Sequence, residues 1–267
     1  MDLQHFVATH LPALERDEAR FNVLIAVLSA AARNPSSALV RWTVGAAGHC
    51  AVRSPGRSIL LGQLDEAECR RLAQDAIDDA GAGVVGADDT ARWFAEHAAS
   101  LGAKLGQPIP QRIHVLSHPP RYPQTAGSAR PATADDASVL YAWLSAFRRE
   151  ATPHDPPPSR EDADKAAQSG RFLLWTVDGE PVAMAALVRS LRHTGAIGAV
   201  YTPPEHRGRG YAGSVTAATA ERIFADGKAS ACLYTDLRNP ASNRCYARIG
   251  FVAHCEAWHY PPAGLAV

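Results

Sequence analysis

The stretch Gly195–Gly250 decides the fold, because strand-like, glycine-rich and helical segments alternate along it. It opens with Gly195-Ala-Ile-Gly-Ala-Val-Tyr-Thr202, whose small and β-branched residues suit a buried strand. Arg207-Gly-Arg-Gly-Tyr-Ala-Gly213 follows, and Ser214–Ala225 has helical composition. Glycines at the start of a helix let backbone N–H groups converge on an anion, and the helix dipole adds partial positive charge there. With its two arginines, this turn predicts a pyrophosphate site.

Two kinds of ligand carry such a pyrophosphate. Gly208–Gly213 matches G-x-G-x-x-G, the dinucleotide fingerprint, and Asp236 stands at a later strand end, as a ribose-binding acid would. The fingerprint belongs to the first strand–helix unit of a parallel sheet, with its first glycine close to the strand end. Here Pro203–Arg207 intervenes, and little chain follows for further parallel strands. An NAD(P)-dependent oxidoreductase is therefore the weaker alternative.

The stretch more closely resembles the acetyl-CoA site of the GNAT N-acetyltransferase superfamily. The motif of that family, Q/R-x-x-G-x-G/A, lies between the fourth strand and the next helix, and Arg207, Gly210 and Ala212 match it. Asn239–Phe251 resembles the second motif, which comprises the exit of the fifth strand, a helix with its Asn and Tyr, and a Gly-Phe opening of the last strand. Both motifs stand in the family's order and separation, and the resemblance covers roughly residues 128–260.

The resemblance implies an N-acetyltransferase that moves an acetyl group from acetyl-CoA, as co-substrate, to a primary amine of a small molecule or peptide. The amine would attack the thioester directly. Backbone groups of the strands at 199–202 and 233–236 would hold the pantetheine arm, and the N–H groups from His206 to Ala212, in the glycine turn, would bind the pyrophosphate. The residues expected at the cofactor are Val200, Tyr201, Thr202, Arg207, Gly208, Arg209, Gly210, Tyr211, Ala212, Asn239 and Asn243.

Tyr246 is the candidate general acid for the departing thiolate, although its ring also suits packing of a helix on the sheet. Asn239 before Pro240 is typical of a helix start, which explains Asn239 without any role at the cofactor. The general base is not identified by the sequence. The candidates are Glu205, His206, His193, His254 and Asp236.

The remaining chain predicts an α/β fold in which the same order of elements occurs twice. The first half reads as a helix around Leu24, strands at 38–44, 49–53 and 57–61, a helix at 64–77, a short strand at 84–86, a helix at 89–105 and a strand at 112–116. The second half repeats this order, with a hairpin around Asp178-Gly179. We expect two GNAT-like domains in tandem, each a central mixed, mostly antiparallel sheet flanked by helices.

The predicted boundaries are 1–116 for a degenerate acetyltransferase-like domain, 117–128 for a linker and 129–267 for the catalytic domain. The first half is called degenerate because its third strand is followed by Gly62–Glu68, which has one glycine, no arginine and three acids. Acids suit the start of a helix, but they would repel a pyrophosphate. We therefore expect no cofactor site in residues 1–116.

Composition sets the remaining limits. Of the 267 residues, 46% are apolar and 20% charged, which is ordinary for a globular protein, and the formal net charge is zero. No basic surface for nucleic acid or membrane is indicated, and the start lacks the pattern of a signal peptide. The five cysteines show no zinc or disulfide spacing, so we expect reduced thiols, a cytoplasmic location and no metal. A non-catalytic acyl-CoA sensor with the same fold remains a further alternative.

Overall fold

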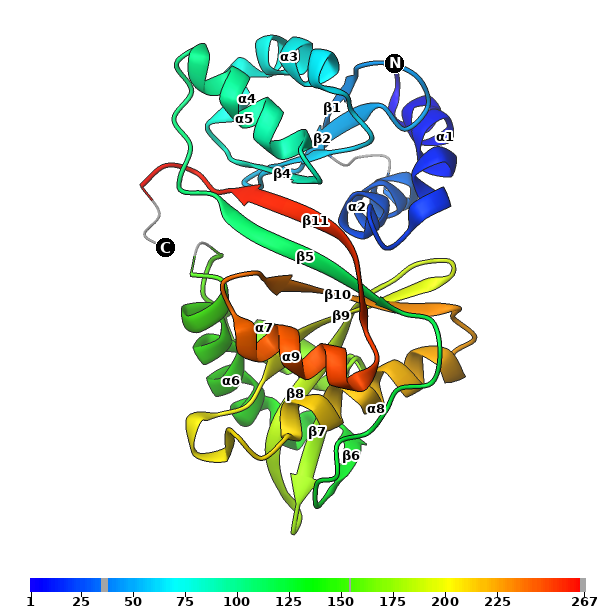
Figure 1. Cartoon of the computed structure of the whole chain (residues 1–267), viewed down its shortest axis with the longest axis vertical. Helices are drawn as coiled ribbons and strands as arrows, with labels where there is room; N and C mark the ends of the chain where they lie inside the picture. The colour runs from blue at the N-terminus through cyan, green and yellow to red at the C-terminus, as the bar shows by residue number, and fades with distance from the viewer. Residues whose placement is uncertain (35–37, 154, 265–267) are drawn as a thin grey trace. The chain divides into compact units, whose positions relative to one another are not determined.

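The computed structural model describes residues 1–34, 38–153 and 155–264, so the last residues of the predicted catalytic domain, 265–267, lie outside the described part (Figure 1). The chain divides into two compact units. Unit 1 comprises Met1–Ile113, Asp236–Arg238 and His254–Val267, and unit 2 comprises His114–Thr235 and Asn239–Ala253. Among the described residues, none of the helices combines the length and apolar character that a membrane span needs.

Unit 1 contains a mixed sheet whose strand order is β1-β2-β3-β4-β11. Its elements are α1 (Leu3–Leu14), η1 (Glu15–Asp17), α2 (Asn22–Arg33), β1 (Val40–Thr43), β2 (Cys50–Arg53), β3 (Ile59–Leu61), α3 (Glu66–Asp75), α4 (Ile77–Ala80), β4 (Val84–Ala87), α5 (Thr90–Ser100) and the first residues of β5 (Ile109–Leu116). Strands β3 and β4 are parallel, and the β1–β2, β2–β3 and β4–β11 pairs are antiparallel. The core joins the sheet to α3 and α5 through residues such as Leu72 and Phe94.

The end of β11 (Val252–Tyr260) pairs with β4, in the register Ala257↔Ala87 to Tyr260↔Val84. Its residues from His254 onward therefore belong to unit 1, whereas the predicted boundary placed the whole last strand in domain 129–267. At the other boundary, His114–Leu116 of β5 belong to unit 2. A strand end takes the partner that completes its backbone hydrogen bonds, and sequence order does not reveal that partner.

Helix α1 is missing from the sequence prediction and supplies a buried histidine. Asp2 caps it by accepting a hydrogen bond from the His5 N–H at 2.8 Å. His10 is 0% exposed, and its Nδ1 accepts the Gly48 N–H at 3.1 Å. Nδ1 therefore carries no proton, and Nε2 carries it, 3.3 Å from the Thr43 hydroxyl.

We expect this histidine to make unfolding pH-dependent. Burial, and then the charge of His49, lower the pKa of His10 below its ordinary value of 6.5. The unfolded chain therefore binds the proton first, so the free energy of unfolding falls as pH drops below about 6.5. Urea titrations between pH 8 and 5 should show this slope in the wild type and in His5→Gln, whose histidine is exposed, and a reduced slope in His10→Leu. An unchanged slope in His10→Leu would assign the effect to other groups.

Unit 2 contains a second mixed sheet, in the order β10-β9-β8-β7-β6. Its elements are β6 (Ser128–Pro131), η2 (Ala134–Asp136), α6 (Ala137–Ala151), α7 (Arg160–Gln168), β7 (Phe172–Val177), β8 (Glu180–Ser190), β9 (Thr194–Tyr201), η3 (Pro204–His206), α8 (Tyr211–Ala225), β10 (Ser230–Asp236) and α9 (Pro240–Ile249). Strands β6 to β9 pair antiparallel, and only β9 and β10 pair parallel. The predicted mixed, mostly antiparallel sheet flanked by helices is thus confirmed, whereas the tandem pair of GNAT-like domains stays a prediction.

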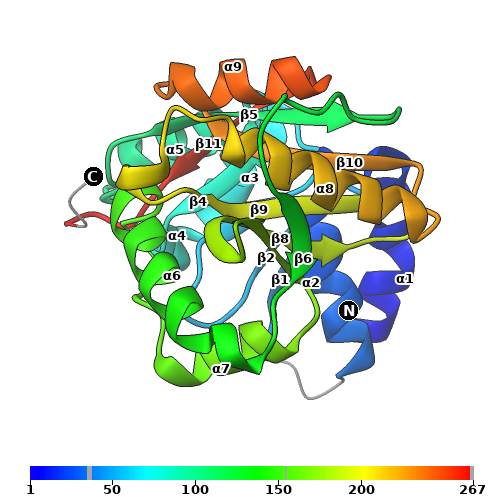
Figure 2. The same ribbon diagram turned by 90° about the horizontal axis from the view of Figure 1, so that it is seen from below.

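Helices lie on both faces of this sheet (Figure 2), and its side chains alternate between two cores. Leu173 and Trp175 of β7 pack with α8 and α9, whereas Leu174 between them packs with α6 and α7. Successive residues of a strand point to opposite faces, so a continuous apolar strand serves a helix layer on each side. Because of this two-sided burial, the sheet forms a rigid frame that fixes where β9 and β10 end.

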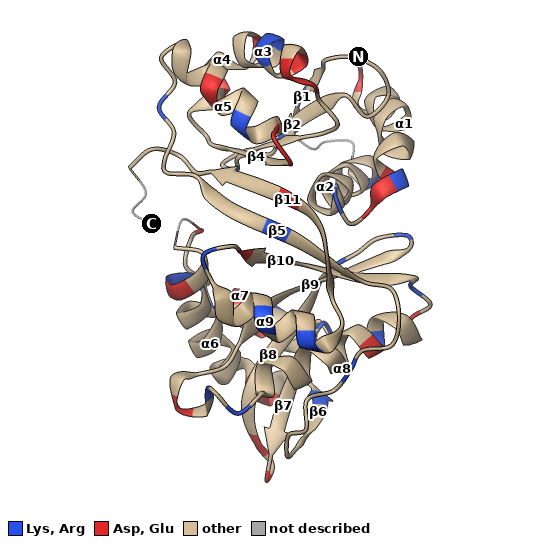
Figure 3. Cartoon of the chain, viewed as in Figure 1, with Lys and Arg blue, Asp and Glu red and all other residues tan. Residues whose placement is uncertain are grey.

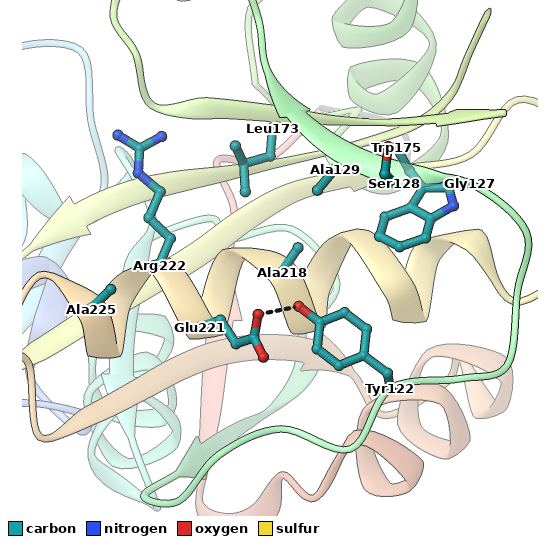
Figure 4. A pocket seen from close by; sticks show the side chains of 10 residues that line it. All are labelled: Tyr122, Gly127, Ser128, Ala129, Leu173, Trp175, Ala218, Glu221, Arg222 and Ala225. Carbon is teal, nitrogen blue, oxygen red and sulfur yellow. Dashed lines mark hydrogen bonds between the residues drawn. The ribbon is translucent and has the colours of Figure 1, made fainter. Parts of the chain in front are cut away.

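The predicted linker is an ordered strap on α8, formed by Arg121–Gly127. The Tyr122 hydroxyl donates to Glu221 at 2.6 Å (Figure 4), and the Thr125 and Ser214 hydroxyls lie 2.7 Å apart. Trp175 Nε1 donates to the Ala126 carbonyl at 2.9 Å. Side-chain hydrogen bonds hold the strap at three points. The Pro and Gly residues of 117–128 therefore belong to a segment with a defined conformation.

Gly127 ends the strap in a conformation that only glycine fits. Its φ is +101°, and a Cβ there would overlap the Thr176 carbonyl oxygen. Gly179 also has positive φ, +86°, but has open space around it. We expect Gly179→Ala to cost about 1–2 kcal/mol from backbone strain alone, and Gly127→Ala roughly 3 kcal/mol or more because a backbone atom must also move. Denaturant titration of both variants measures the difference, and equal losses would contradict the steric argument.

Candidate active site

The candidate site begins where β9 and β10 stop pairing. Their parallel ladder runs from Ser230↔Thr194 to Leu233↔Ile197. Gly198–Tyr201 and Tyr234–Asp236 continue beyond this ladder. The two strands thus end without pairing to each other.

A β-bulge turns the end of β9. Met184 pairs with Tyr201 and Ala186 with Gly198, so β9 has one more residue than β8 over this interval. Ala199 lies within the bulge with φ +49°, in the left-handed region that few non-glycine residues adopt. Bulges redirect a strand next to functional sites, and strain at such a residue is kept only where the surroundings enforce it. The bulge therefore indicates that residues 198–201 are the part of β9 that belongs to the candidate site.

The glycine turn, Arg207–Ala212, follows η3 and forms the N-terminus of α8. Gly208 and Gly210 have φ +78° and +85°, and Gly210 is the N-cap residue of this helix. Arg207 to Gly210 are exposed. The first N–H groups of α8 therefore face outward at the positive end of a helix of 15 residues, which is the arrangement that binds phosphate groups.

Two buried polar atoms beside the turn have no partner. Among the described residues, neither Thr202 Oγ1 nor His206 Nδ1 finds a hydrogen-bond partner, although both atoms are buried. The His206 ring packs edge-on against Tyr211, with centroids 6.5 Å apart. Leaving a buried polar atom unsatisfied costs free energy, so such atoms indicate a place for a ligand or a water molecule. The residues present thus fit a polar ligand at the β9–α8 junction.

Arg207 folds back from the turn onto β9 and α6. Its Nε donates to the Thr202 carbonyl at 2.9 Å, and its Nη2 lies 2.7 Å from Glu150 Oε2. The guanidinium also lies 5.6 Å from the centre of the Tyr201 ring. The Tyr201 hydroxyl donates to Glu150 Oε1 at 3.2 Å. Sequence reasoning missed Glu150, because it lies one residue before the end of α6, in a run of charged residues that matches no motif.

Helix α9 is tied to the end of β10 by its asparagines. The Asn239 side chain caps α9 by accepting the Ser242 N–H at 3.1 Å, as predicted. Asn243 Nδ2 donates to the Asn239 carbonyl at 2.8 Å, and its Oδ1 accepts from the Thr235 hydroxyl at 2.8 Å. That hydroxyl in turn lies 3.2 Å from His114 Nε2. In the structure Asn243 thus links α9 to β10, and its role at the cofactor stays a prediction.

Tyr246 lies on the buried side of α9. It is 9% exposed, and its ring meets Phe251 edge-on at 6.1 Å. Burial, and then the neighbouring Cys245, raise the pKa of Tyr246 above its ordinary value of 10. The hydroxyl is therefore protonated at neutral pH, which suits a proton donor and excludes a base.

The structure separates the candidate bases. His193 precedes β9, at the end of that strand opposite Tyr201. Burial favours a higher pKa for Asp236, but hydrogen bonds from Arg238 outweigh it and lower that pKa. His254 bonds to Asp17 at 2.8 Å within unit 1. Only Glu205, which is exposed, and His206 adjoin the glycine turn.

A pocket of about 520 Å³ lies elsewhere in unit 2 (Figure 4). Its lining includes Tyr122, Leu173, Trp175, Glu221 and Arg222, along the C-terminal half of α8. None of the predicted cofactor residues lines it. Among the described His, Cys, Asp and Glu residues, no group of three or more is placed to hold a metal ion.

A family model matches the part of the chain that contains the glycine turn. The model described as the acetyltransferase (GNAT) family matches residues 137–251, which include β7 to β10, the glycine turn and α9. The chain contains a GNAT acetyltransferase domain. Within that domain, only the β9–β10 pair on either side of α8 is parallel and the β6–β7, β7–β8 and β8–β9 pairs are antiparallel, whereas a dinucleotide fingerprint belongs to a parallel sheet.

Solved structures share the fold of the GNAT domain and of most of the chain. A GCN5-related N-acetyltransferase from Kribbella flavida is 20% identical, with a TM-score of 0.61 over 92% of this chain and 96% of that one. A Drosophila protein is 18% identical, with a TM-score of 0.60 over 79% and 73%. A GCN5-related N-acetyltransferase from Sphaerobacter thermophilus is 16% identical, with a TM-score of 0.58 over 87% and 84%. None of the curated proteins compared matches the chain.

The segment of unit 1 that is predicted to correspond to the glycine turn, Gly62–Glu68, differs from the turn in charge and in hydrogen bonding. Asp65 caps α3 by accepting the Glu68 N–H at 2.8 Å, and Glu68 accepts the Asp65 N–H at 3.0 Å. Both donors are thus already used, and carboxylates stand where phosphate oxygens would bind. Figure 3 shows acidic as well as basic bands on α3. The absence of a cofactor site in residues 1–116 remains a prediction.

Proposed function

We propose that this protein transfers an acetyl group from acetyl-CoA to a primary amine of a small molecule or peptide, by direct attack of the amine on the thioester. The observation that carries the proposal is the junction of β9 and α8. The β9–β10 ladder ends there, and an exposed glycine turn begins the next helix within a few residues. A thioester arm between the strand ends and a pyrophosphate on the turn fit this one junction.

We assign the following roles to residues of the chain. N–H groups of the glycine turn, with Arg209, bind the pyrophosphate at the positive end of α8. Backbone groups of 198–201 hold the arm and polarise the acetyl carbonyl. Thr202 Oγ1 and His206 Nδ1 then gain partners through the bound ligand or its waters.

The reaction needs one group that donates a proton to the thiolate and one route by which the amine loses its own proton. The amine nitrogen attacks the carbonyl carbon, the carbon–sulfur bond breaks, and the thiolate takes a proton from the Tyr246 hydroxyl. The amine loses its own proton to water or to a base, and the tyrosinate regains one from solvent. Donation from a phenol to a thiol with a pKa of about 8.5 is uphill, and more so here because burial raises the pKa of Tyr246 above its ordinary value of 10, so positioning must compensate.

A screen of primary amines for CoA release tests the proposal. The full chain is incubated with acetyl-CoA and each of a panel of amino acids, polyamines, aminoglycosides and peptide N-termini. Amine-dependent release of free CoA, with acetylated amine detected by mass spectrometry, is expected for at least one class. Tight binding of acetyl-CoA without turnover of any amine would favour the sensor alternative, and no binding would refute both.

A further inference from the structure

The contacts of Arg207 form a binding site for a cation, within the described residues of unit 2. Glu150 supplies a carboxylate oxygen at 2.7 Å, Thr202 a carbonyl oxygen at 2.9 Å, and the Tyr201 ring lies 5.6 Å from the guanidinium carbon. Carboxylates, carbonyl oxygens and aromatic faces are the groups that bind organic cations. We call the set Glu150, Tyr201 and Thr202 the cation site.

The cation site lies at the end of β9. Tyr201 ends β9, beyond the last residue of the β9–β10 ladder, and Thr202 follows it directly. Thr202 also offers its buried hydroxyl oxygen, which has no partner among the described residues. Trp143 of α6 packs against Tyr201, with ring centroids 6.4 Å apart. An ammonium has three N–H donors, and these oxygens can accept them.

Arg207 belongs to two sites at once. It is the first residue of the glycine turn, next to the expected pyrophosphate, yet its side chain is held by Glu150. Guanidinium–phosphate pairs are bidentate and stronger than an exposed carboxylate pair, and here the two side chains are 47% and 40% exposed. A bound pyrophosphate therefore competes for Arg207 on favourable terms and leaves Glu150 without its cation.

We infer that the cation site is the acceptor site, that Arg207 fills it until the cofactor draws the guanidinium away, and that the acceptor is an amine bound as its ammonium. This inference rests on the proposed function and names its substrate class. It makes binding of cofactor and acceptor mutually favourable, because the cofactor empties the site that the acceptor fills. In the free protein, the negative charge of Glu150 is thereby paired with Arg207.

Glu150→Gln tests the inference, because it keeps the shape of the side chain and removes its charge. Glu161→Gln is the matched control, since Glu161 is an exposed glutamate of α7 that pairs with Lys165. CoA and n-butylammonium are the probes, followed by calorimetry. CoA should bind Glu150→Gln about two- to fivefold more tightly, the free-energy equivalent of an exposed ion pair that no longer has to break. The control should bind CoA as the wild type does.

Glu150→Gln should weaken the binding of n-butylammonium, whereas it should strengthen the binding of CoA. CoA should strengthen n-butylammonium binding to the wild type, whereas Glu150→Gln should bind n-butylammonium at least tenfold more weakly in the presence of CoA. Arg207→Ala, with the site already open, should bind n-butylammonium without CoA. Unchanged or weaker CoA binding by Glu150→Gln, or no coupling of the two probes in the wild type, would overturn the inference.

The proposed function and the inference fail differently. If the wild type and Glu150→Gln acetylate amines with equal KM, the protein is an acetyltransferase and its acceptor site is elsewhere. If CoA and n-butylammonium show the expected coupling but no amine is acetylated, the cation site stands and the transferase does not. Thermal melts of both glutamine variants confirm that each remains folded.

Discussion

Gly210→Glu is expected to abolish acetyl-CoA binding while the protein remains folded. Gly210 is the N-cap of α8, and its φ of +85° lets the backbone present its N–H groups to the ligand. Glutamate places a side chain and a negative charge at the position where the pyrophosphate approaches. A Cβ there would also lie 2.9 Å from the methyl carbon of Thr125, so the strap must give slightly. Calorimetry with acetyl-CoA should show one site per chain in the wild type and none in the variant.

Gly227→Glu is the control that separates strain from loss of the site. Gly227 follows the other end of α8 with φ +79° and open space around it. Both substitutions force a side chain into the left-handed region, at about 1–2 kcal/mol each, so thermal melts should shift by similar amounts. Only Gly210→Glu should lose acetyl-CoA. Normal binding by that variant would place the pyrophosphate elsewhere in the chain.

The elements of the site could be predicted because their signals are local. Glycines next to a helical run predicted the turn and α8, and Asn239 before Pro240 predicted the start of α9. The Asp178-Gly179 turn signal predicted the hairpin of β7 and β8. Each of these signals lies within a few residues of the structure it specifies, and a single sequence carries it in full.

The features that were missed depend on residues far apart in the sequence. Glu150 acquires its meaning from Arg207, which lies 57 positions later. The strap was predicted as a linker because proline and glycine mark loops, whether or not a side chain such as Tyr122 ties the loop down. Likewise, the pairing of β11 with β4 follows from which strand end lacked a partner. Such contacts arise from tertiary structure and leave no periodic or spacing signal.

Tyr246→Phe is expected to lower kcat by roughly 10²–10⁴-fold, the usual contribution of a general acid. The substitution removes one hydroxyl and keeps the ring, whose edge-on contact with Phe251 does not involve the oxygen. Affinity for acetyl-CoA should change by less than about tenfold, because the phosphate and pantetheine contacts are made by other groups. Tyr260→Phe is the control: Tyr260 is half-buried in unit 1, and burial raises its pKa also, but it has no assigned role.

The pH profile distinguishes an acid from a packing residue and from a base. In the wild type, kcat should rise with pH while the acceptor amine deprotonates, and Tyr246→Phe should keep this slope at a lower level. Because burial raises the pKa of Tyr246, ionisation of the phenol should not reduce wild-type kcat below about pH 10. A base would show the reverse, with the rising slope lost in the variant. If Tyr246→Phe turns over normally with an acceptor of the wild type, the tyrosine only packs α9 on the sheet, and water or another donor protonates the thiolate.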